Sequence, residues 1–412
     1  MAVPVTIPRV VSRGVSRYVP SRAYGGGLAD ALIGSESQGL AVDFTDFSMV
    51  IRDTGTPANN FSGNPNSKLT YSSPSTKWIL GSNGLYQSGT TLRTEYNSSG
   101  VALGVRIEEA RTNVVLHNRD LTNVAWTKTN TTAAKDQTGI DGVANSASSL
   151  TATAGNGTCL QAITLASSAR YQSAFVKRIT GSGTINMTMD NGTTWTAVTV
   201  TASWTKVEIP TQTLANPTVG FRIVTSGDAI AIDMVGNENG TFSTSPIVTA
   251  GSTVTRAADN ISATDVVSWL NGTLTQHYKT GIIGYSTNMI SLETGNSASG
   301  EFSRSSGFYN TTTNFIAIQR DGAGATINSN SMTIISPVGR TIKVATVYAT
   351  NDMAYCVDGT IGNVDAVGTI GTSANKIWIG RSYDSQLGAH HLKQVMILPR
   401  RMSNADMQTL TT

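Results

Sequence analysis

Residues 185–210 read INMTMDNGTTWTAVTVTASWTKVEIP, and this stretch decides the fold class. Apolar and polar residues alternate along it, as they do where successive side chains point to opposite faces of a β-strand. Asn191 and Gly192 interrupt the alternation, and this pair readily adopts the positive φ angles of a tight hairpin turn. The stretch therefore predicts antiparallel strands joined by a hairpin.

The same rhythm continues on both sides of this hairpin. Further strand-like segments follow one another at spacings of roughly ten residues, which is typical of a β-sandwich or jelly roll. They are RYQSAFVKRI, VGFRIVTSG and AIAIDMVGNE. We expect residues 126–260 to form one such domain, with the build of a carbohydrate-binding module.

Residues 261–412 predict a second β-sandwich. Their strand-like segments include RTIKVATVYAT, MAYCVDGT and KIWIGRS, and their order resembles that of concanavalin-like or laminin-G-like sandwiches. Asp358-Gly359 is expected to turn a hairpin. One helix is predicted, from Asn404 to Leu410, with Ser403 as its N-cap and Asp406 in its first turn.

The composition supports an all-β chain of two or three domains. Of its 412 residues, 13% are charged and 39% apolar, and the net charge of +3 gives no case for a nucleic-acid partner. Cys159 and Cys356 fall in different predicted domains, so no disulfide is expected. The chain lacks both a secretory signal and an apolar run of about 18 residues, which predicts synthesis in the cytoplasm and no membrane insertion.

The N-terminal region predicts an extended arm over residues 1–40, followed by a hairpin-rich attachment and junction region over 41–125. In the junction region, Trp78-Ile79 leads into a Gly/Ser/Asn turn and Leu85-Tyr86 resumes the strand. The guanidinium groups of the arm suit an acidic groove on a partner protein, and a solvated terminus is the alternative. The arginines in question are Arg9, Arg13, Arg17 and Arg22.

The most distinctive segment is GVRIEEARTNVVLHNRDLTNVAW, with Ile107–Asn113 as its core and Trp126 at its end. It resembles a segment common in virion and tail proteins of tailed bacteriophages. Two other segments resemble their counterparts in that family, the hairpin sequence NGLYQSG at 83–89 and VTRAAD at 254–259. The resemblance implies a virion location, usually on the tail, other phage tail or capsid proteins as partners, and a homo-oligomer, with a trimer favoured. A short arm replaces the family's long fibre-forming domain, so the station on the particle stays open.

Two adjacent carboxylates in this segment raise the question of an ion pair at the domain junction. Glu108 and Glu109 would point to opposite faces of a strand, so they cannot act as a catalytic pair. Either could pair with Arg106 or Arg111. Glu109 with Arg111 is the better candidate, because residues two apart share a face, and ordinary solvated charges are the alternative.

Catalytic and metal-binding patterns are not evident in the sequence, and we expect no enzyme activity and no cofactor. Glycoside hydrolysis uses two facing carboxylates, and Glu293 and Glu301 are a poor candidate pair. The histidines and cysteines lack the spacing of a zinc site or of a nucleophilic triad. Calcium remains possible through loop oxygens, for which the candidates are Asp321, Asp352 and Asp384.

Glycan binding is the remaining hypothesis, because sugar rings stack on exposed aromatic faces beside hydrogen-bonding side chains. Trp204 and Trp378 lie within apolar alternation and are expected in cores. The candidates are Tyr309, Asn310, Tyr383, Asp384 and Trp195. The sequence thus predicts a tail-associated virion protein that contacts a bacterial surface glycan, with a capsid decoration or head-fibre protein and a glycan depolymerase as alternatives.

Overall fold

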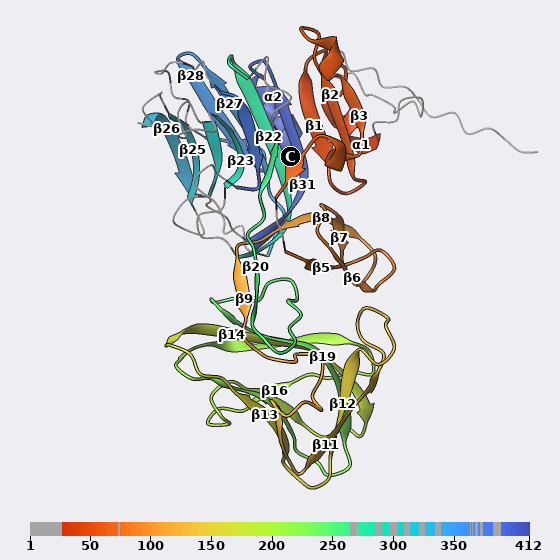
Figure 1. The fold of residues 1–412 in the computed structure, drawn as a ribbon. Coiled ribbons are helices and arrows are strands. Elements are labelled where there is room, and N and C mark those ends of the chain that lie inside the picture. Colours follow the sequence, from red (N-terminus) through yellow and green to blue (C-terminus); the bar gives the residue numbers. More distant parts are fainter. Residues whose placement is uncertain are drawn as a thin grey trace, which may run out of the picture.

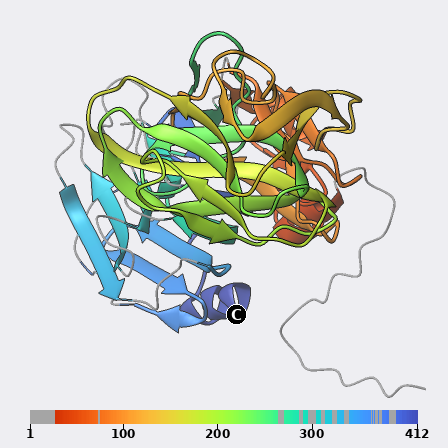
Figure 2. The same ribbon diagram turned by 90° about the horizontal axis from the view of Figure 1, so that it is seen from below.

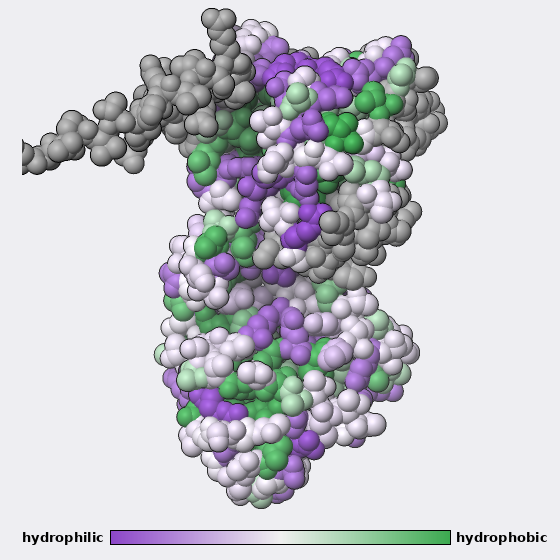
Figure 3. Space-filling model, turned by 180° about the vertical axis from the view of Figure 1, so that it is seen from behind, coloured by the Kyte–Doolittle hydropathy of each residue, from purple (hydrophilic) through white to green (hydrophobic). Residues whose placement is uncertain are grey.

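The fold is all-β, as the alternation predicts. The computed structural model describes residues 27–72, 75–263, 270–285, 290–295, 304–308, 314–320, 326–333, 339–362, 364, 366, 370, 374–381 and 389–412. Within these residues, antiparallel strands build two β-sandwiches, which stack one above the other (Figure 1). The space-filling view in Figure 3 shows the molecule narrowing between them.

The first sandwich contains strands from both ends of the described chain. One of its layers, the β22 sheet, runs in the order β29 (Thr360–Ile361), β28 (Asp352–Val357), β27 (Lys343–Ala349), β22 (Leu274–Tyr285), β31 (Ala389–Leu398), β1 (Gly39–Asp43), β2 (Ser48–Arg52) and β3 (Phe61–Gly63). Strand β8 (Ala102–Ile107) also pairs with β31, and β7 (Thr94–Tyr96) pairs with β8.

The second layer of this sandwich is the β23 sheet. Its order is β26 (Thr326–Thr333), β25 (Asn314–Arg320), β24 (Arg304–Phe308), β23 (Ile290–Gly295), β30 (Lys376–Ile379), β21 (Ile261–Ala263) and β4 (Thr70–Tyr71). One buried apolar cluster joins the two layers, with Val42 and Ile397 from one and Leu292 and Ile377 from the other. Burial of such side chains, at about 25 cal/mol per Å² of apolar surface, holds the layers together.

The second sandwich is inserted between two strands of the first. Its β14 sheet runs β11 (Thr131–Gln137), β12 (Ala147–Ala152), β19 (Ala229–Asn239), β14 (Ser168–Thr180) and β17 (Thr205–Leu214). The facing β18 sheet runs β10 (Thr127–Thr129), β13 (Gly157–Ala162), β18 (Thr218–Ile223), β15 (Ile185–Thr188) and β16 (Thr196–Val198). Figure 2 shows this inserted sandwich from below.

Two short paired strands connect the sandwiches. Strand β9 (Arg111–Asn113) enters the insert and β20 (Val254–Arg256) leaves it, and Arg111 lies opposite Arg256 in their register. The expected boundary at 260/261 lies between β20 and β21, close to the observed end of the insert, whereas the boundary at 125/126 falls inside the insert, after β9. Residues 39–107 do not form a separate junction region, because β1 pairs with β31 through contacts such as Leu40 with Ile397.

Several local predictions are confirmed. Asn191 and Gly192 turn the chain after β15 with φ of 61° and 78°, and Asp358 and Gly359 turn it between β28 and β29 with φ of 46° and 78°. Helix α2 (Asn404–Thr411) begins at Ser403, whose side chain accepts the Asp406 N–H. The remaining elements are helix α1 (Gly27–Ile33), the 3-10 turns η1 (Pro57–Asn59) and η2 (Pro65–Ser67), and the hairpin of β5 (Lys77–Leu80) and β6 (Tyr86–Gly89).

Helix α1 was not expected, since it lies inside the predicted arm; the arginines of that arm lie outside the described residues. Both cysteines are free and buried. Within the described part of the chain, no helix has the length and apolar character needed to cross a membrane.

Candidate functional site

Glu108 lies at the centre of the connection between the sandwiches, and its side chain is fully buried. It accepts hydrogen bonds from Arg106 Nε at 2.7 Å and from both the N–H and the hydroxyl of Ser245 at 2.6 Å. Arg256 Nη1 lies 3.0 Å away. Burial acts to raise the pKa of Glu108, but Arg106, Arg256, Lys77 and the Ser245 hydrogen bond hold it well below its ordinary value.

Asp259 fixes the returning chain at the same place. The Glu108 N–H donates to its carboxylate at 2.7 Å, and the Asp259 N–H donates to the Glu108 carbonyl at 2.9 Å. Lys77 and the Tyr71 hydroxyl also donate to the Asp259 carboxylate. Buried charges are tolerated only when paired and hydrogen-bonded in this way, so this network holds the two connecting strands together.

The structure also brings Glu109 and Arg111 together as an ion pair. The Arg111 guanidinium carbon lies 4.7 Å from the centroid of the Phe242 ring. The Glu109 side chain is 37% exposed, whereas Glu108 is inaccessible to solvent. Glu109 is therefore peripheral, although its partner Arg111 is itself buried, and Glu108 with Arg106, the less favoured alternative, lies in the interior of the junction.

The β5–β6 hairpin packs against the inserted sandwich. The Tyr86 N–H donates to the Ile140 carbonyl at 3.0 Å, and the Tyr86 ring meets the Phe175 ring edge-on with centroids 4.9 Å apart. On the other strand, the Arg119 guanidinium carbon lies 5.7 Å from the Trp78 ring centroid. Aromatic and cation–π contacts of this kind contribute about 1 kcal/mol each, so the hairpin bridges the two sandwiches.

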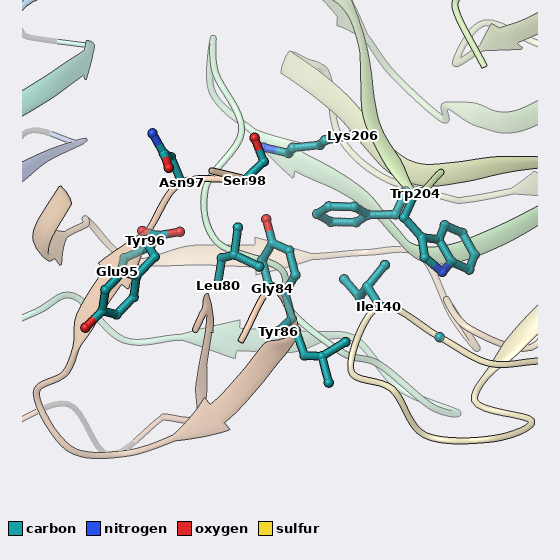
Figure 4. A pocket seen from close by; sticks show the side chains of 13 residues that line it. Leu80, Gly84, Tyr86, Glu95, Tyr96, Asn97, Ser98, Ile140, Trp204 and Lys206 are labelled. Atoms are coloured by element: carbon teal, nitrogen blue, oxygen red, sulfur yellow. The ribbon is translucent and has the colours of Figure 1, made fainter. Parts of the chain in front are cut away.

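A cleft of about 420 Å³ opens where the hairpin meets the insert (Figure 4). Trp204 and Lys206 enter it from the insert, while Tyr86, Glu95 and Asn97 enter from the other side. Ligand pockets of about 300–1,000 Å³ with aromatic walls and a few polar groups commonly lie between domains. The cleft is lined by Leu80, Gly84, Leu85, Tyr86, Glu95, Tyr96, Asn97, Ser98, Gly139, Ile140, Phe175, Trp204 and Lys206.

The polar groups of the cleft are held in place by their neighbours. Glu95 accepts from His391 Nε2 at 2.8 Å if that nitrogen carries the proton, and lies 3.5 Å from Arg106. Burial acts to raise the pKa of Glu95, but Arg106 and His391 outweigh it and lower the pKa. Asn97 accepts the N–H groups of Ser99 and Val101 within its own turn. Glu95 is therefore an ionised, fixed acceptor.

This arrangement can bind a polar ligand that has a flat apolar face. Tyr86, Tyr96 and Trp204 supply aromatic surface, and Asn97, Ser98 and Lys206 supply hydrogen-bonding groups. Among the described residues that line the cleft, Glu95 is the single carboxylate, whereas glycosidases commonly use two.

The residues predicted from sequence lie elsewhere. Trp195 is half-buried, with the Arg222 guanidinium carbon 4.5 Å from its ring centroid and Gly192 against the indole, so part of its surface is already covered. Trp378 is buried as expected, but Trp204 is half-buried and lines the cleft, which corrects its expected core position. The candidates Tyr309, Asn310, Tyr383 and Asp384 lie outside the described residues.

The calcium candidates give no site within the described residues. Asp352 pairs with Arg401 at 2.8 Å, and no cluster of three or more metal-binding side chains is found in the part of the chain that the structure describes. Asp321 and Asp384 lie outside it, as does Glu301.

Sequence reasoning missed the cleft because its walls come from separate strands. The one available signal was the hairpin itself, which places Trp78 and Tyr86 on either side of an exposed turn.

No protein-family model matches the chain, and no curated protein matches it. Among solved structures, the SAP-like pentraxin of Limulus polyphemus is similar over 34% of this chain and 70% of its own, with 14% identity and a TM-score of 0.28. The Ruminococcus gnavus IT-sialidase CBM40, solved with alpha2,3 sialyllactose, covers 34% of this chain and 83% of its own, with 10% identity and a TM-score of 0.30.

A third similar structure is the binding domain of botulinum neurotoxin serotype C1. It matches 37% of this chain and 40% of its own length, with 11% identity and a TM-score of 0.30. Likenesses at these TM-scores carry no argument about a ligand, which has to come from the cleft itself.

Proposed function

We propose that this chain is a non-enzymatic structural protein of a tailed-bacteriophage particle that contacts a surface glycan through the cleft beside the β5–β6 hairpin. The observation that carries the proposal is the position of the three segments that resemble the phage family. Ile107–Asn113 and residues 254–259 pair directly, through β9 with β20 and through Glu108 with Asp259. Residues 83–89 join them through Gly89, which lies opposite Lys77 in the hairpin, and Lys77 donates to the Arg106 carbonyl and to Asp259. The cleft opens beside that junction.

The chemistry of the cleft favours a sugar as ligand. Sugar rings combine apolar C–H faces with hydroxyl groups, and the cleft offers half-buried Tyr86, Tyr96 and Trp204 beside the fixed acceptor Glu95. A tail-associated station and a homo-oligomer, with a trimer favoured, are part of the proposal and rest on the family resemblance.

A glycan array with purified full-length protein and two tryptophan variants tests the site. Trp204→Ala removes an aromatic wall of the cleft, and we expect glycan affinity to fall about tenfold or more. Trp195→Ala is the matched control and should bind normally. Loss of binding in Trp195→Ala alone would show that the glycan binds at Trp195 and not in the cleft. Shortening of the bound glycans would favour a depolymerase.

Localisation of the protein on purified particles tests whether it lies on the tail or on the head. Cryo-microscopy would compare full-length protein with a version lacking residues 1–24. Density at the tail that disappears on truncation is the expected result, while density spread over the head would favour a decoration protein.

A further inference from the structure

We infer that the cleft continues along strands β14 and β17 into a second subsite formed by Tyr171, Glu208 and Ser243, so that the ligand is a neutral glycan chain of several sugar units. This inference rests on the proposed function, because it assumes that the cleft binds a glycan.

The register of strands β14 and β17 places residues of the cleft and of the proposed second subsite in one row. Phe175 lies directly opposite Lys206, and both line the cleft. The next pair on the same face is Ser173 opposite Glu208. The β14–β17 register shifts between Arg170 and Gln172, but the Tyr171 hydroxyl donates to Glu208 at 3.2 Å, which places Tyr171 on the same face beyond Ser173. From Phe175 to Tyr171 the strand rises about 13 Å, which is longer than a single hexose ring.

The side chains of this strip are linked by hydrogen bonds and remain accessible. Lys206 Nζ lies 2.8 Å from the Glu208 carboxylate and 2.5 Å from the Ser243 hydroxyl. The Ser243 and Tyr171 hydroxyls both donate to Glu208, the latter at 3.2 Å. The Glu208 side chain is 37% exposed and that of Lys206 29% exposed. A ligand can therefore reach groups whose positions are already set.

Each of these groups is suited to sugar hydroxyls. Glu208 can accept from two neighbouring hydroxyls at once, as carboxylates do. Burial and the neighbouring Glu208 raise the pKa of Tyr171 to about 12, so its hydroxyl keeps its proton at neutral pH. The half-buried Tyr171 ring adds aromatic surface.

The charges of the strip favour a neutral chain. Lys206 is paired with Glu208, and Glu95 is paired with Arg106 and His391. Lys206 is the one cation among the described residues that line the cleft, and its pairing with Glu208 leaves a uronic or sialic acid carboxylate no unpaired cation there. The chemistry thus points to a polysaccharide of uncharged hexose units.

The test is a binding titration of full-length protein and of Trp204→Ala with gluco-, galacto- and manno-oligosaccharides from monosaccharide to hexasaccharide. Oligosaccharides that contain uronic or sialic acid are titrated in parallel. Wild-type affinity should rise with chain length. Tyr171→Phe and Glu208→Gln, which keep the size of each side chain, should each reduce the affinity for the longer oligosaccharides about tenfold. Tyr171→Phe should leave monosaccharide binding unchanged, because Tyr171 does not line the cleft, whereas Glu208→Gln should also weaken it, because Lys206 in the cleft loses its partner. Thr213→Ala, an exposed position farther along β17, is the control. Thermal unfolding of each variant checks its fold.

The outcomes separate this inference from the proposed function. Equal affinity at every length, or an unchanged length dependence in both variants, would overturn the second subsite. Binding of acidic glycans alone, lost in Trp204→Ala, would overturn the neutral chain and leave the proposed cleft standing. If neither neutral nor acidic glycans bind in a manner that depends on Trp204, both proposals are wrong.

Discussion

Glu108 and Glu109 are neighbours in the chain, yet they lie in different environments. Glu108 is enclosed by Arg106, Arg256 and Ser245, while Glu109 pairs with Arg111 at the surface. The two-residue spacing indicated the pair of Glu109 with Arg111, because residues two apart on one strand share a face. The same spacing joins Arg106 to Glu108, but the partners Ser245 and Arg256, which complete the burial of Glu108, lie 137 positions or more away, and no local pattern indicates those contacts.

This difference predicts unequal effects of two matched substitutions. Glu108→Gln leaves the buried Arg256 without its anion and Arg106 with Glu95 alone, and we expect the free energy of unfolding to fall by about 3 kcal/mol or more. Glu109→Gln removes a partly exposed pair and should lower it by about 1 kcal/mol or less. Chemical denaturation of both variants measures the contrast. Equal losses would show that the interior network does not stabilise the junction.

His277 on β22 predicts a dependence of stability on pH. Burial, with Lys343 and Lys279, lowers its pKa to about 4, although its hydrogen bond to Val344 opposes the shift. The unfolded state then binds more protons between about pH 6.5 and pH 4. The contribution of neutral His277 to the free energy of unfolding is therefore fully present above about pH 6.5. It is lost as the pH falls toward 4, and the loss is on the order of 3 kcal/mol.

Denaturation of wild type and His277→Gln at about pH 7 and about pH 4.5 measures this effect. The variant should lose less stability on acidification than the wild type. Glu108 does not obscure the comparison, because its strongly lowered pKa places its own loss at more acidic pH. Identical losses in the two proteins would contradict the assignment to His277.

Among the elements, the β5–β6 hairpin shows which features a local sequence pattern predicts and which it does not. Its strands and its Gly/Ser/Asn turn follow from the sequence, and Gly84 has the positive φ of 76° that such turns use. Its role as a bridge between the two sandwiches does not follow from the sequence, because the contacts of Trp78 with Arg119 and of Tyr86 with Phe175 join distant parts of the chain.

The hairpin gives an element-scale prediction. Trp78→Ala removes the contact with Arg119 and should loosen the hairpin from the insert, so the Tyr86 N–H that bonds to Ile140 should exchange with solvent about tenfold faster. Hydrogen exchange read residue by residue measures this rate. Ser88→Ala, at an exposed position of the same hairpin, should leave it unchanged. An unaltered rate in Trp78→Ala would show that the hairpin is held by other contacts.

At the scale of the whole molecule, two β-sandwiches were predictable but their connectivity was not. The expected boundaries followed composition and motif positions, whereas the chain completes the first sandwich only after the second has been built. Strands β1 and β31 pair across 351 positions, as in the hydrogen bond between Gln394 and Asp43. Periodicity indicates which residues face a core and does not indicate which distant strand supplies the partner.

The insert should fold on its own. Its main apolar cluster runs from Val115 to Val235 and contains no residue of the first sandwich. We expect residues 109–258, expressed alone, to unfold in a single cooperative transition in scanning calorimetry. A broad, non-cooperative transition would show that the insert depends on the first sandwich.

The pairing of β9 with β20 has a further consequence for how such a protein can evolve. Because the insert is one continuous stretch of sequence and its two ends leave the scaffold side by side, a single recombination event can replace it as a cassette. A replacement domain needs only two ends that lie about 5 Å apart, which is one interstrand spacing, to continue from the paired strands β9 and β20. The residues that the insert contributes to the cleft can change in this way while the first sandwich keeps its sequence.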